Sequence, residues 1–341
     1  MDRLNEEWDS MYGLRRTGAF FVRKAARLVT LLIAVSILSF SLVSLSPIDP
    51  VQAYIGADLM RVGAEQRENI AAYWGLDAPP PERYLRWASA VVRGDLGTSM
   101  IYREPVAKVI QEQFFHSLLL MLAAWLMSGV IGFLAGSLAA MKKDSWFDRF
   151  IVWYCYTLAA TPAFWLGLVL MVVFSVWLGW FPVGMGVPAG VLAEQVTWLD
   201  KLEHLVLPAI TLSIVGIAPI ALHTRQKLIE VLSSDYVLFA RARGETPLSI
   251  YRRHGLRNIA FPALTLQFAS FSELFGGTVL VEHVFSYPGL GEAMVEAGLR
   301  GDVPLLLGIV LFSTVFVFIG NAIADFIYRV IDPRLREAQA S

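Results

Sequence analysis

Apolar residues in this chain gather into long runs, and polar segments separate each run from the next. A helix rises 1.5 Å per residue, so about 20 apolar residues cross the roughly 30 Å hydrocarbon core of a bilayer. The runs suited to crossing are Leu28–Leu45, Ser117–Met141, Phe150–Trp180, Leu205–Leu222, Ile259–Val281 and Pro304–Ala324. The pattern therefore predicts an all-α polytopic membrane protein with six transmembrane helices.

Two of these runs carry further information. Ser117–Met141 has small residues at helical spacing, which allow helices to approach closely within a bilayer; they are Gly129, Gly132, Gly136 and Ala140. Phe150–Trp180 is 31 residues long, too long for one straight perpendicular helix. We expect Thr161-Pro162 to kink or break it, because proline cannot continue the helical hydrogen-bond ladder.

Composition agrees with a membrane protein: 56% of residues are hydrophobic, 17% are charged and the mean hydropathy is +0.56. These values exclude an ordinary soluble domain. The single cysteine, Cys155, excludes a disulfide within the chain and is expected to be a small buried apolar residue.

The basic residues predict the orientation. Segments 1–27, 141–149, 223–258 and the C-terminal tail contain 19 of the 28 Lys and Arg residues. Loops rich in Lys and Arg stay in the cytoplasm, so both ends are expected there. The first run is expected to be a retained helix, not a cleaved signal peptide, because no small-x-small site precedes Pro47.

The expected organisation follows from these runs. It comprises a cytoplasmic segment 1–27, a first span 28–45, an exported cap 46–113, a membrane core 114–336 with a cytoplasmic loop 223–258, and a tail 337–341. The cap is predicted to contain short helices separated by turns at its proline and glycine clusters.

The stretch Tyr236–Pro262 is predicted to be a folded cytoplasmic loop. It contains five arginines between two apolar runs. Gly244 suits the left-handed conformation that closes a helix, Thr246 suits an N-cap, and Pro247 suits the first helical position. A folded basic loop with two short helices indicates a docking surface.

Several motifs, in order along the chain, resemble one family. They are P-I-D-P at 47–50, W-G-L-D-A-P at 74–79, G-D-L-G-T-S at 94–99, A-R-A-R-G at 240–244 followed by His254 and Pro262, V-E-H-V-F-S-Y-P-G-L-G at 281–291, and D-F-I-Y-R-V-I-D-P-R-L-R at 325–336. Together they resemble the permeases of dipeptide, oligopeptide and nickel ABC importers, specifically the first of the two membrane subunits. Ile48 stands where that family usually has glycine.

The resemblance implies a type I ABC importer permease fold in a bacterial inner membrane. It implies a related second permease as a heterodimer partner, two cytoplasmic ABC ATPases and a periplasmic or lipid-anchored binding protein. ATP and Mg would be bound by the ATPases, and this chain would bind no cofactor and no nucleic acid. Specificity in such systems lies largely with the binding protein, so peptide is the default substrate; nickel chelates, opines, glutathione-like thiols and saccharides stay open.

The resemblance also implies which residues couple this chain to an ATPase. They are Ala240, Arg241, Arg243, Gly244, Glu245, Thr246, Pro247, Leu248 and Tyr251. The neighbouring Arg252 and Arg253 have two equally weighted interpretations, namely docking to the ATPase and anchoring to anionic lipid headgroups.

Catalytic and metal motifs are missing from the sequence. It contains no G-x-x-x-x-G-K-[ST] phosphate loop, no H-E-x-x-H, no paired cysteines and no G-x-S-x-G. No two of its five histidines are spaced i, i+4. We therefore expect neither catalytic residues nor a metal site, and an energy source on another subunit.

Glu273 is the one ionisable residue predicted well inside a span, where an unpaired charge is costly. Gln267, Ser270, Glu273 and Gly277 are expected to form one polar helical stripe. That stripe either faces a substrate pathway, where an acid suits a cationic group, or forms hydrogen bonds between helices.

Two other functional classes compete with the permease. An ion-coupled secondary transporter would use Glu273 as its proton site, but no internal repeat relates residues 28–180 to 205–325. A membrane-embedded enzyme would need a nucleophile or metal constellation, and the sequence contains none.

Overall fold

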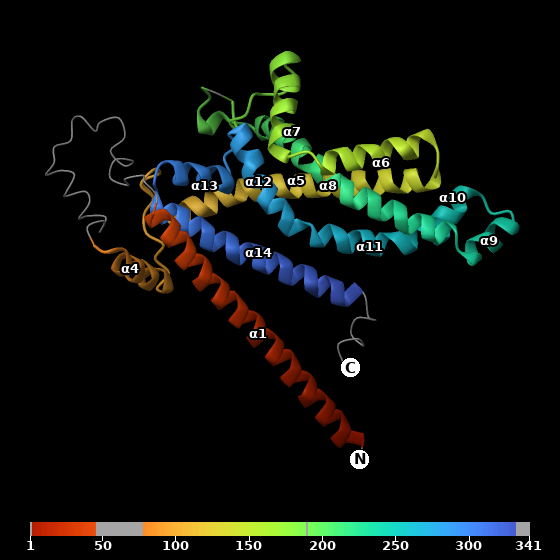
Figure 1. The fold of residues 1–341 in the computed structure, drawn as a ribbon, viewed down its shortest axis with the longest axis horizontal. Helices are drawn as coiled ribbons and strands as arrows, with labels where there is room; N and C mark the ends of the chain where they lie inside the picture. Colours follow the sequence, from red (N-terminus) through yellow and green to blue (C-terminus); the bar gives the residue numbers. More distant parts are fainter. Residues whose placement is uncertain (1, 46–77, 189, 332–341) are drawn as a thin grey trace. The chain divides into compact units, whose positions relative to one another are not determined.

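The computed structural model describes residues 2–45, 78–188 and 190–331, with side chains described for 22–45, 78–188, 190–192 and 194–325. These residues are helical throughout, apart from connecting loops and one isolated bridge between Thr98 and Pro105 (Figure 1). The helices are α1 Asp2–Ser44, α4 Pro80–Val92, α5 Val106–Met141, α6 Trp146–Ala159, α7 Ala163–Leu170, η2 Met171–Trp177, η3 Ala193–Gln195, α8 Trp198–Leu232, α9 Asp235–Ala242, α10 Pro247–Ile250, η4 Tyr251–Gly255, α11 Leu256–Ala269, α12 Phe271–Phe285, α13 Leu290–Leu299 and α14 Val303–Ile331.

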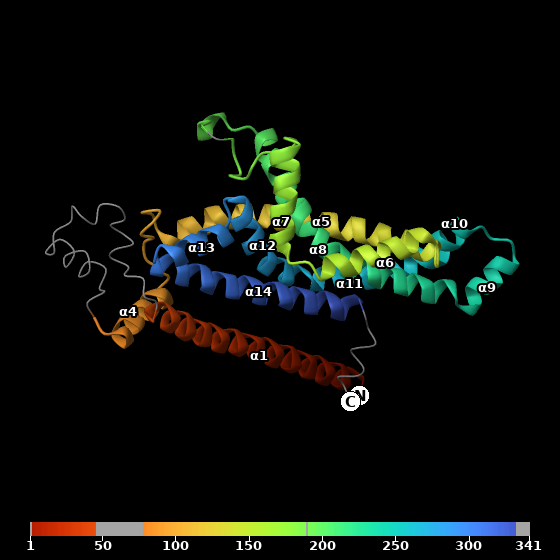
Figure 2. The ribbon, with the colours of Figure 1, turned by 45° about the horizontal axis from the view of Figure 1, so that its top comes forward.

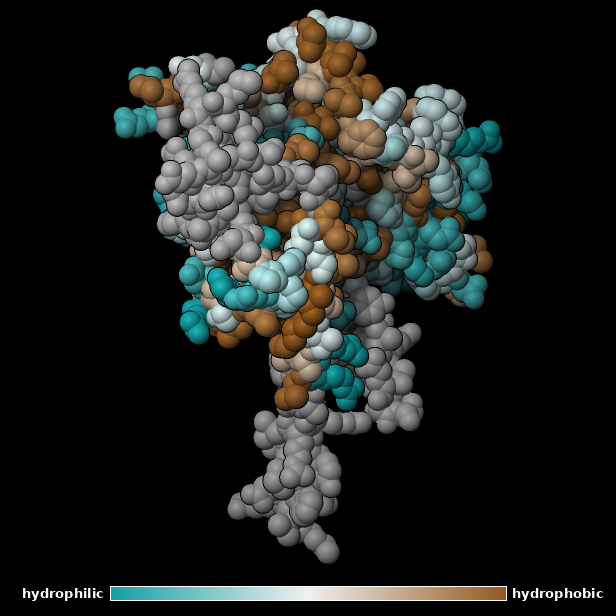
Figure 3. All heavy atoms as spheres, turned by 60° about the vertical axis from the view of Figure 1, so that its left-hand side comes forward, coloured by the Kyte–Doolittle hydropathy of each residue, from teal (hydrophilic) through white to brown (hydrophobic). Residues whose placement is uncertain are grey.

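The predicted class, an all-α polytopic membrane protein, is confirmed. Among the described residues, four helices are long and apolar enough to cross a bilayer: Val22–Ser44, Val106–Met141, Trp198–Leu232 and Val303–Asp325. The number rises to six only if each of two bent helix pairs counts as one span. Many large apolar side chains lie on the surface, as expected for residues that face lipid or other subunits (Figure 3).

The helices extend beyond the apolar runs. α8 begins at Trp198 because Thr197 and Asp200 form a capping box, and it continues to Leu232. The first ten residues of the expected loop 223–258 are therefore helical, which corrects the predicted boundary. Local capping chemistry, not the edge of the apolar run, determines where this helix starts.

Two breaks interrupt the apolar helices. The expected break at Thr161-Pro162 is confirmed, since α6 and the following helix Ala163–Trp177 meet at 108° (Figure 1). A second break, of 49°, falls at Ser270 and was not predicted. There the Gln267 carbonyl accepts hydrogen bonds from the Trp125 indole at 2.8 Å and the Ser270 hydroxyl at 2.9 Å, so it is not free to continue the helical ladder.

The chain forms two compact units, residues 1–110 with 296–319, and residues 111–295 with 320–341. In the first, Phe40 packs with Val303 and Leu307, and Tyr84 and Trp87 lie against that cluster. The buried carboxylate of Asp302 accepts hydrogen bonds from Ser99 Oγ, Ile101 N and Leu305 N, at 2.6, 3.0 and 3.1 Å. The end of the G-D-L-G-T-S motif is thus fixed to the start of α14.

In the second unit, α6, α7, α11 and α12 all pack against α8 (Figure 2). The glycines of α5 bring that helix close to α8 as well. A Cβ atom at Gly136 would lie 2.3 Å from the carbonyl oxygen of Ala221, and one at Gly132 would lie 3.0 Å from that of Ile217. The predicted close packing through small residues is confirmed.

Some expectations concern residues outside the described ones. These are P-I-D-P at 47–50, most of W-G-L-D-A-P, the cap between residues 46 and 77, the end of the motif at 325–336, and the tail 337–341.

Candidate functional site

The loop after α8 is folded as its sequence predicts. Gly244 has φ +81° and follows the end of α9 at Ala242 and Arg243. Thr246 is the N-cap of α10, its hydroxyl oxygen accepting a hydrogen bond from Ser249 N at 3.3 Å, and Pro247 occupies the first turn. The left-handed glycine, the N-cap and the proline together determine the backbone conformation between α9 and α10.

A small apolar core attaches this loop to α8. Val237, Ala240 and Ile250 are buried together, and Val231 and Leu232 of α8 pack against them. Ala240, expected as a docking residue, is therefore internal to the loop. The loop is therefore attached to the end of a long helix by buried side chains.

The outer surface of the loop combines apolar and basic side chains. Phe239 is 71% exposed, Leu248 is 59% exposed, and Leu238 is exposed beside them in sequence. Arg243 is also exposed. The sequence interpretation included Leu248 and Arg243 but missed Leu238 and Phe239, which the burial of their neighbours Val237 and Ala240 leaves on the outside of α9.

Three predicted coupling residues make contacts within the chain. Arg241 donates a hydrogen bond to the Leu232 carbonyl at the end of α8, at 3.4 Å. Glu245 accepts from Ser249 Oγ at 3.0 Å and lies 4.0 Å from Arg253. Tyr251 packs against the buried cluster that joins α5, α8 and α11. These residues stabilise the loop, whereas Gly244, Thr246 and Pro247 remain exposed at its tip.

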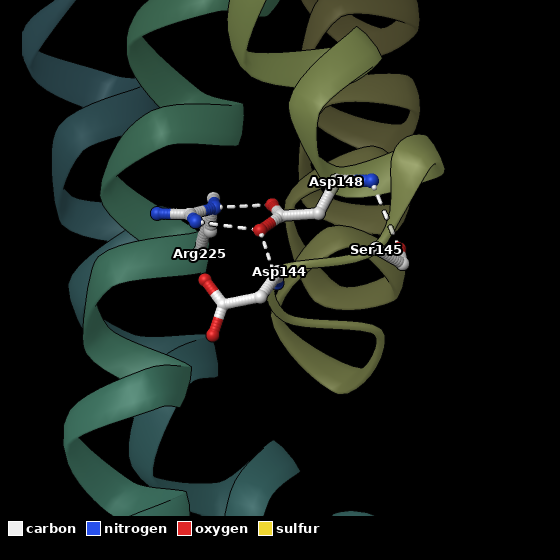
Figure 4. A network of polar contacts seen from close by, with 4 residues as sticks. All are labelled: Asp144, Ser145, Asp148 and Arg225. Carbon is white, nitrogen blue, oxygen red and sulfur yellow. Dashed lines mark hydrogen bonds and ion pairs between the residues drawn. The ribbon is translucent and has the colours of Figure 1, made fainter.

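A buried ion pair lies near the loop, and the sequence interpretation did not identify it. Asp148 of α6 is 2% exposed and accepts from Arg225 of α8 through both oxygens, at 2.6 and 2.7 Å (Figure 4). Asp148 also accepts from Asp144 N at 2.9 Å, and its own N–H donates to the Ser145 hydroxyl at 3.2 Å. Ser145 is the N-cap of α6. The start of α6 is thus locked to α8.

The position of this pair matters for the loop. Arg225 lies seven residues, about two helical turns, before the end of α8 at Leu232. The same helix carries the apolar core of the loop. Near the loop, α6 is therefore joined to α8 by a two-point contact between charged groups, the strongest kind of side-chain hydrogen bonding, in addition to the apolar packing of the two helices around Cys155.

The four residues of the predicted polar stripe do not form one surface. Gln267 is buried, and its Nε2 donates to the Trp125 carbonyl at 2.6 Å. Glu273 is exposed, and among the described residues its carboxylate has no hydrogen-bond or ion-pair partner. Gly277 packs near Leu212 of α8. The break at Ser270 changes the helix direction between Gln267 and Glu273, which corrects the expectation of a continuous stripe.

A third buried carboxylate, after Asp302 and Asp148, lies one residue beyond the predicted fifth span. Glu282 is fully buried at the end of α12, where it accepts from Ser117 Oγ at 2.6 Å and Gly291 N at 2.7 Å. Leu290 N donates to the same Ser117 hydroxyl at 2.7 Å. Glu282 therefore accepts hydrogen bonds from the first N–H groups of α13, which have no acceptor within that helix. Its position after an apolar run was the signal that sequence analysis could have used.

No group of three or more metal-ligating side chains occurs within the described part of the chain. His283 pairs with Glu292 at 2.8 Å, and His116 packs edge-on to Tyr287. These histidines have ordinary structural contacts.

These features define a polytopic helical membrane protein with a folded basic loop. Comparison with known proteins identifies the family to which the chain belongs within that class. The family described as "Binding-protein-dependent transport system inner membrane component" matches residues 132–337. The chain is 34% identical over 318 residues to the oligopeptide transport system permease protein AppB of Bacillus subtilis, covering 93% of this chain and 99% of AppB. It is 35% identical over 333 residues to the di/tripeptide permease DppB of Pseudomonas aeruginosa, covering 93% and 98%. It is 34% identical over 318 residues to the glutathione permease GsiC of Escherichia coli, again covering 93% and 98%.

The chain therefore belongs to the binding-protein-dependent transport system inner membrane components. It is a permease subunit of an ABC importer and a multi-pass protein of the bacterial inner membrane. Membership of this family implies a partner ATPase and a substrate-binding protein. Nothing in these similarities supports an ion-coupled carrier built around Glu273.

Proposed function

We propose that this chain forms half of a pathway for peptides or a related small solute, and that ATP hydrolysed on other subunits moves it through the loop after α8. The observation that carries the proposal is the contrast within that loop. Its inner residues are packed on α8, while Leu238, Phe239, Leu248 and Arg243 are exposed. Exposed apolar side chains with a basic neighbour suit a protein partner that has an apolar cleft and acidic rim.

The complete transporter would contain a related second permease, two cytoplasmic ABC ATPases that hold ATP and Mg, and a periplasmic or lipid-anchored binding protein. Both ends of this chain and the loop 233–255 would lie in the cytoplasm, in agreement with the distribution of Lys and Arg. The chain itself would hold no catalytic group.

Peptides are the proposed substrate class because the similar proteins AppB and DppB are named as oligopeptide and di/tripeptide permeases. Glu273 is the pathway residue that we propose within this chain. A carboxylate cannot face lipid without a large cost, and the described residues offer it no partner. A water-filled pathway shared with the second permease would accommodate it, and the acid would suit a peptide amino group.

Copurification tests the docking proposal. Leu248→Asp and Arg243→Glu place charge where the proposed cleft is apolar or acidic, so the ATPases should be lost while the chain remains monodisperse in detergent. Arg149→Glu is the matched control, because Arg149 is an exposed arginine on α6. Full ATPase recovery with both loop variants would refute docking through this surface.

Uptake measurements test the pathway proposal separately. Glu273→Gln should reduce uptake of peptides with a free amino group more than uptake of N-acetylated peptides, with ATPase copurification unchanged. Equal effects on both peptide classes would remove Glu273 from the pathway.

A further inference from the structure

An apolar groove of about 480 Å³ opens between α5, α8 and α11. The lining residues are Trp125, Leu126, Gly129, Val130, Phe133, Leu134, Ile220, Leu256, Ala260, Ala263, Leu264 and Gln267. Gln267 is the one amide among them, and its Nε2 is already bonded to the Trp125 carbonyl. The Gln267 side chain also lies over Gly129, where a Cβ atom would be 2.9 Å from its Cδ. The groove therefore suits hydrocarbon and not a peptide.

Two basic side chains lie at the N-terminal end of α11, where that helix borders the groove. Leu256, Ala260 and Leu264 are spaced four residues apart and follow one face of α11, and Arg253 lies three residues before Leu256, in the π-helical turn η4 that leads into α11. Arg257 lies three residues before Ala260 and adjoins the same face. Both arginines are exposed; Arg253 lies 4.0 Å from Glu245, and no described acid pairs with Arg257.

We propose that this groove and its two arginines bind one anionic glycerophospholipid, with an acyl chain along α5 and α11 and the phosphate at Arg253 and Arg257. The occupant must match both an apolar channel and a positively charged end. An apolar transmembrane helix of a partner subunit would fill the groove but would bring no anion to Arg253 and Arg257. A lipid with a negative headgroup satisfies both.

Selectivity should come from the headgroup. Within a bilayer an acyl chain gains little by moving from lipid neighbours to Leu and Val side chains, because both surroundings are apolar. Each basic residue near the headgroup should raise the affinity for an anionic lipid, relative to a zwitterionic one, about fivefold. The two arginines together should therefore favour phosphatidylglycerol over phosphatidylcholine by about 25-fold.

Tryptophan quenching in the assembled transporter provides the test. The complex is placed in nanodiscs of phosphatidylcholine containing increasing fractions of acyl-brominated phosphatidylglycerol or acyl-brominated phosphatidylcholine. The difference in emission between wild type and Trp125→Phe isolates the signal from the groove. Brominated phosphatidylglycerol should quench Trp125 at about one twenty-fifth of the fraction that brominated phosphatidylcholine requires.

Three variants make the outcome specific. Arg253→Gln with Arg257→Gln should bring the two lipids to equal quenching, Arg149→Gln should leave the preference unchanged, and Val130→Phe should reduce quenching by both lipids. Equal quenching in wild type, or a preference that survives loss of both arginines, would overturn the proposal. Absence of quenching by either lipid would show that protein covers the groove and would overturn it as well. Mass spectrometry of lipids retained by each purified variant gives a second readout that does not depend on Trp125.

Discussion

Replacing one member of the Asp148–Arg225 pair should destabilise the chain more than any exposed charge change nearby. Asp148→Asn keeps the size of the side chain and the Ser145 cap, but it leaves the Arg225 guanidinium without its anion. Arg225→Gln has the converse effect, because it leaves the Asp148 carboxylate, which is 2% exposed, without its positively charged partner. Either change removes a contact made through two hydrogen bonds of 2.6 and 2.7 Å.

The magnitude follows from burial. Breaking a buried ion pair costs about 3–5 kcal/mol, because one charge stays buried without a partner. The Arg225 side chain retains 21% of its exposure, so water can partly solvate it, and the lower end of that range, about 3 kcal/mol, applies. The double variant Asp148→Asn with Arg225→Gln should lose less than the sum of the two single changes, with a coupling energy of about 1–3 kcal/mol.

Unfolding by SDS in mixed micelles, followed by far-UV circular dichroism, measures these differences. The matched control is Lys227→Gln, two residues from Arg225 on the same helix. Lys227 pairs with Glu230 at 2.8 Å, but both side chains are substantially exposed, so the expected loss is below about 1 kcal/mol. If Lys227→Gln is as damaging as Asp148→Asn, or if the two changes of the buried pair are additive, the assigned role is wrong. In the assembled transporter, Asp148→Asn should also lower the ratio of transport to ATP hydrolysis.

Three further predictions use the same unfolding assay or hydrogen exchange. Gly136→Ala should lower the free energy of unfolding by about 1–3 kcal/mol, because the new methyl group meets the Ala221 carbonyl. Gly276→Ala, which has open space around its Cβ position, should leave the free energy of unfolding unchanged or raise it by up to about 1 kcal/mol. Equal effects would contradict the close α5–α8 contact. Glu282→Gln should lower the free energy of unfolding by about 1–3 kcal/mol, because the new amide NH2 would face one of the two donors, Ser117 Oγ or Gly291 N. Unchanged hydrogen exchange of the amides at the start of α13 would refute this. Asp302→Asn should speed exchange of the amides at 99–103 by about tenfold, and protection equal to wild type would contradict the anchoring of that segment.

Local features of the loop after α8 could be predicted from sequence because their causes are local. A glycine with φ +81°, a threonine cap and a proline in the first turn depend on residues a few positions apart. The break at Thr161-Pro162 was predictable for the same reason, since proline removes a donor wherever it stands. The break at Ser270 was not, because it depends on an indole donor 142 residues away on α5.

The buried charges escaped prediction for a related reason. Asp148 and Arg225 are 77 residues apart and were assigned to two separate loops. Their contact depends on the register of α6 against α8, which hydropathy does not determine. Glu282 was missed because the apolar run ends at Val281, although the helix continues to Phe285. The prediction named Glu273, inside the run, although of these two acids on α12 it is Glu282 that is buried.

The carboxyl group of Glu282 also restricts how this region can change over generations. A Cβ atom at Gly289 would lie 2.2 Å from the Glu282 carboxyl carbon, and one at Gly291 would lie 2.4 Å from the Cα atom of Val279. Glu282 and Gly289 are thus expected to change together, because a side chain at 289 fits only if the side chain at 282 becomes smaller. Laboratory evolution of this turn should recover a larger residue at 289 only together with a smaller one at 282, and should retain Gly291, because its close neighbour is the Val279 backbone.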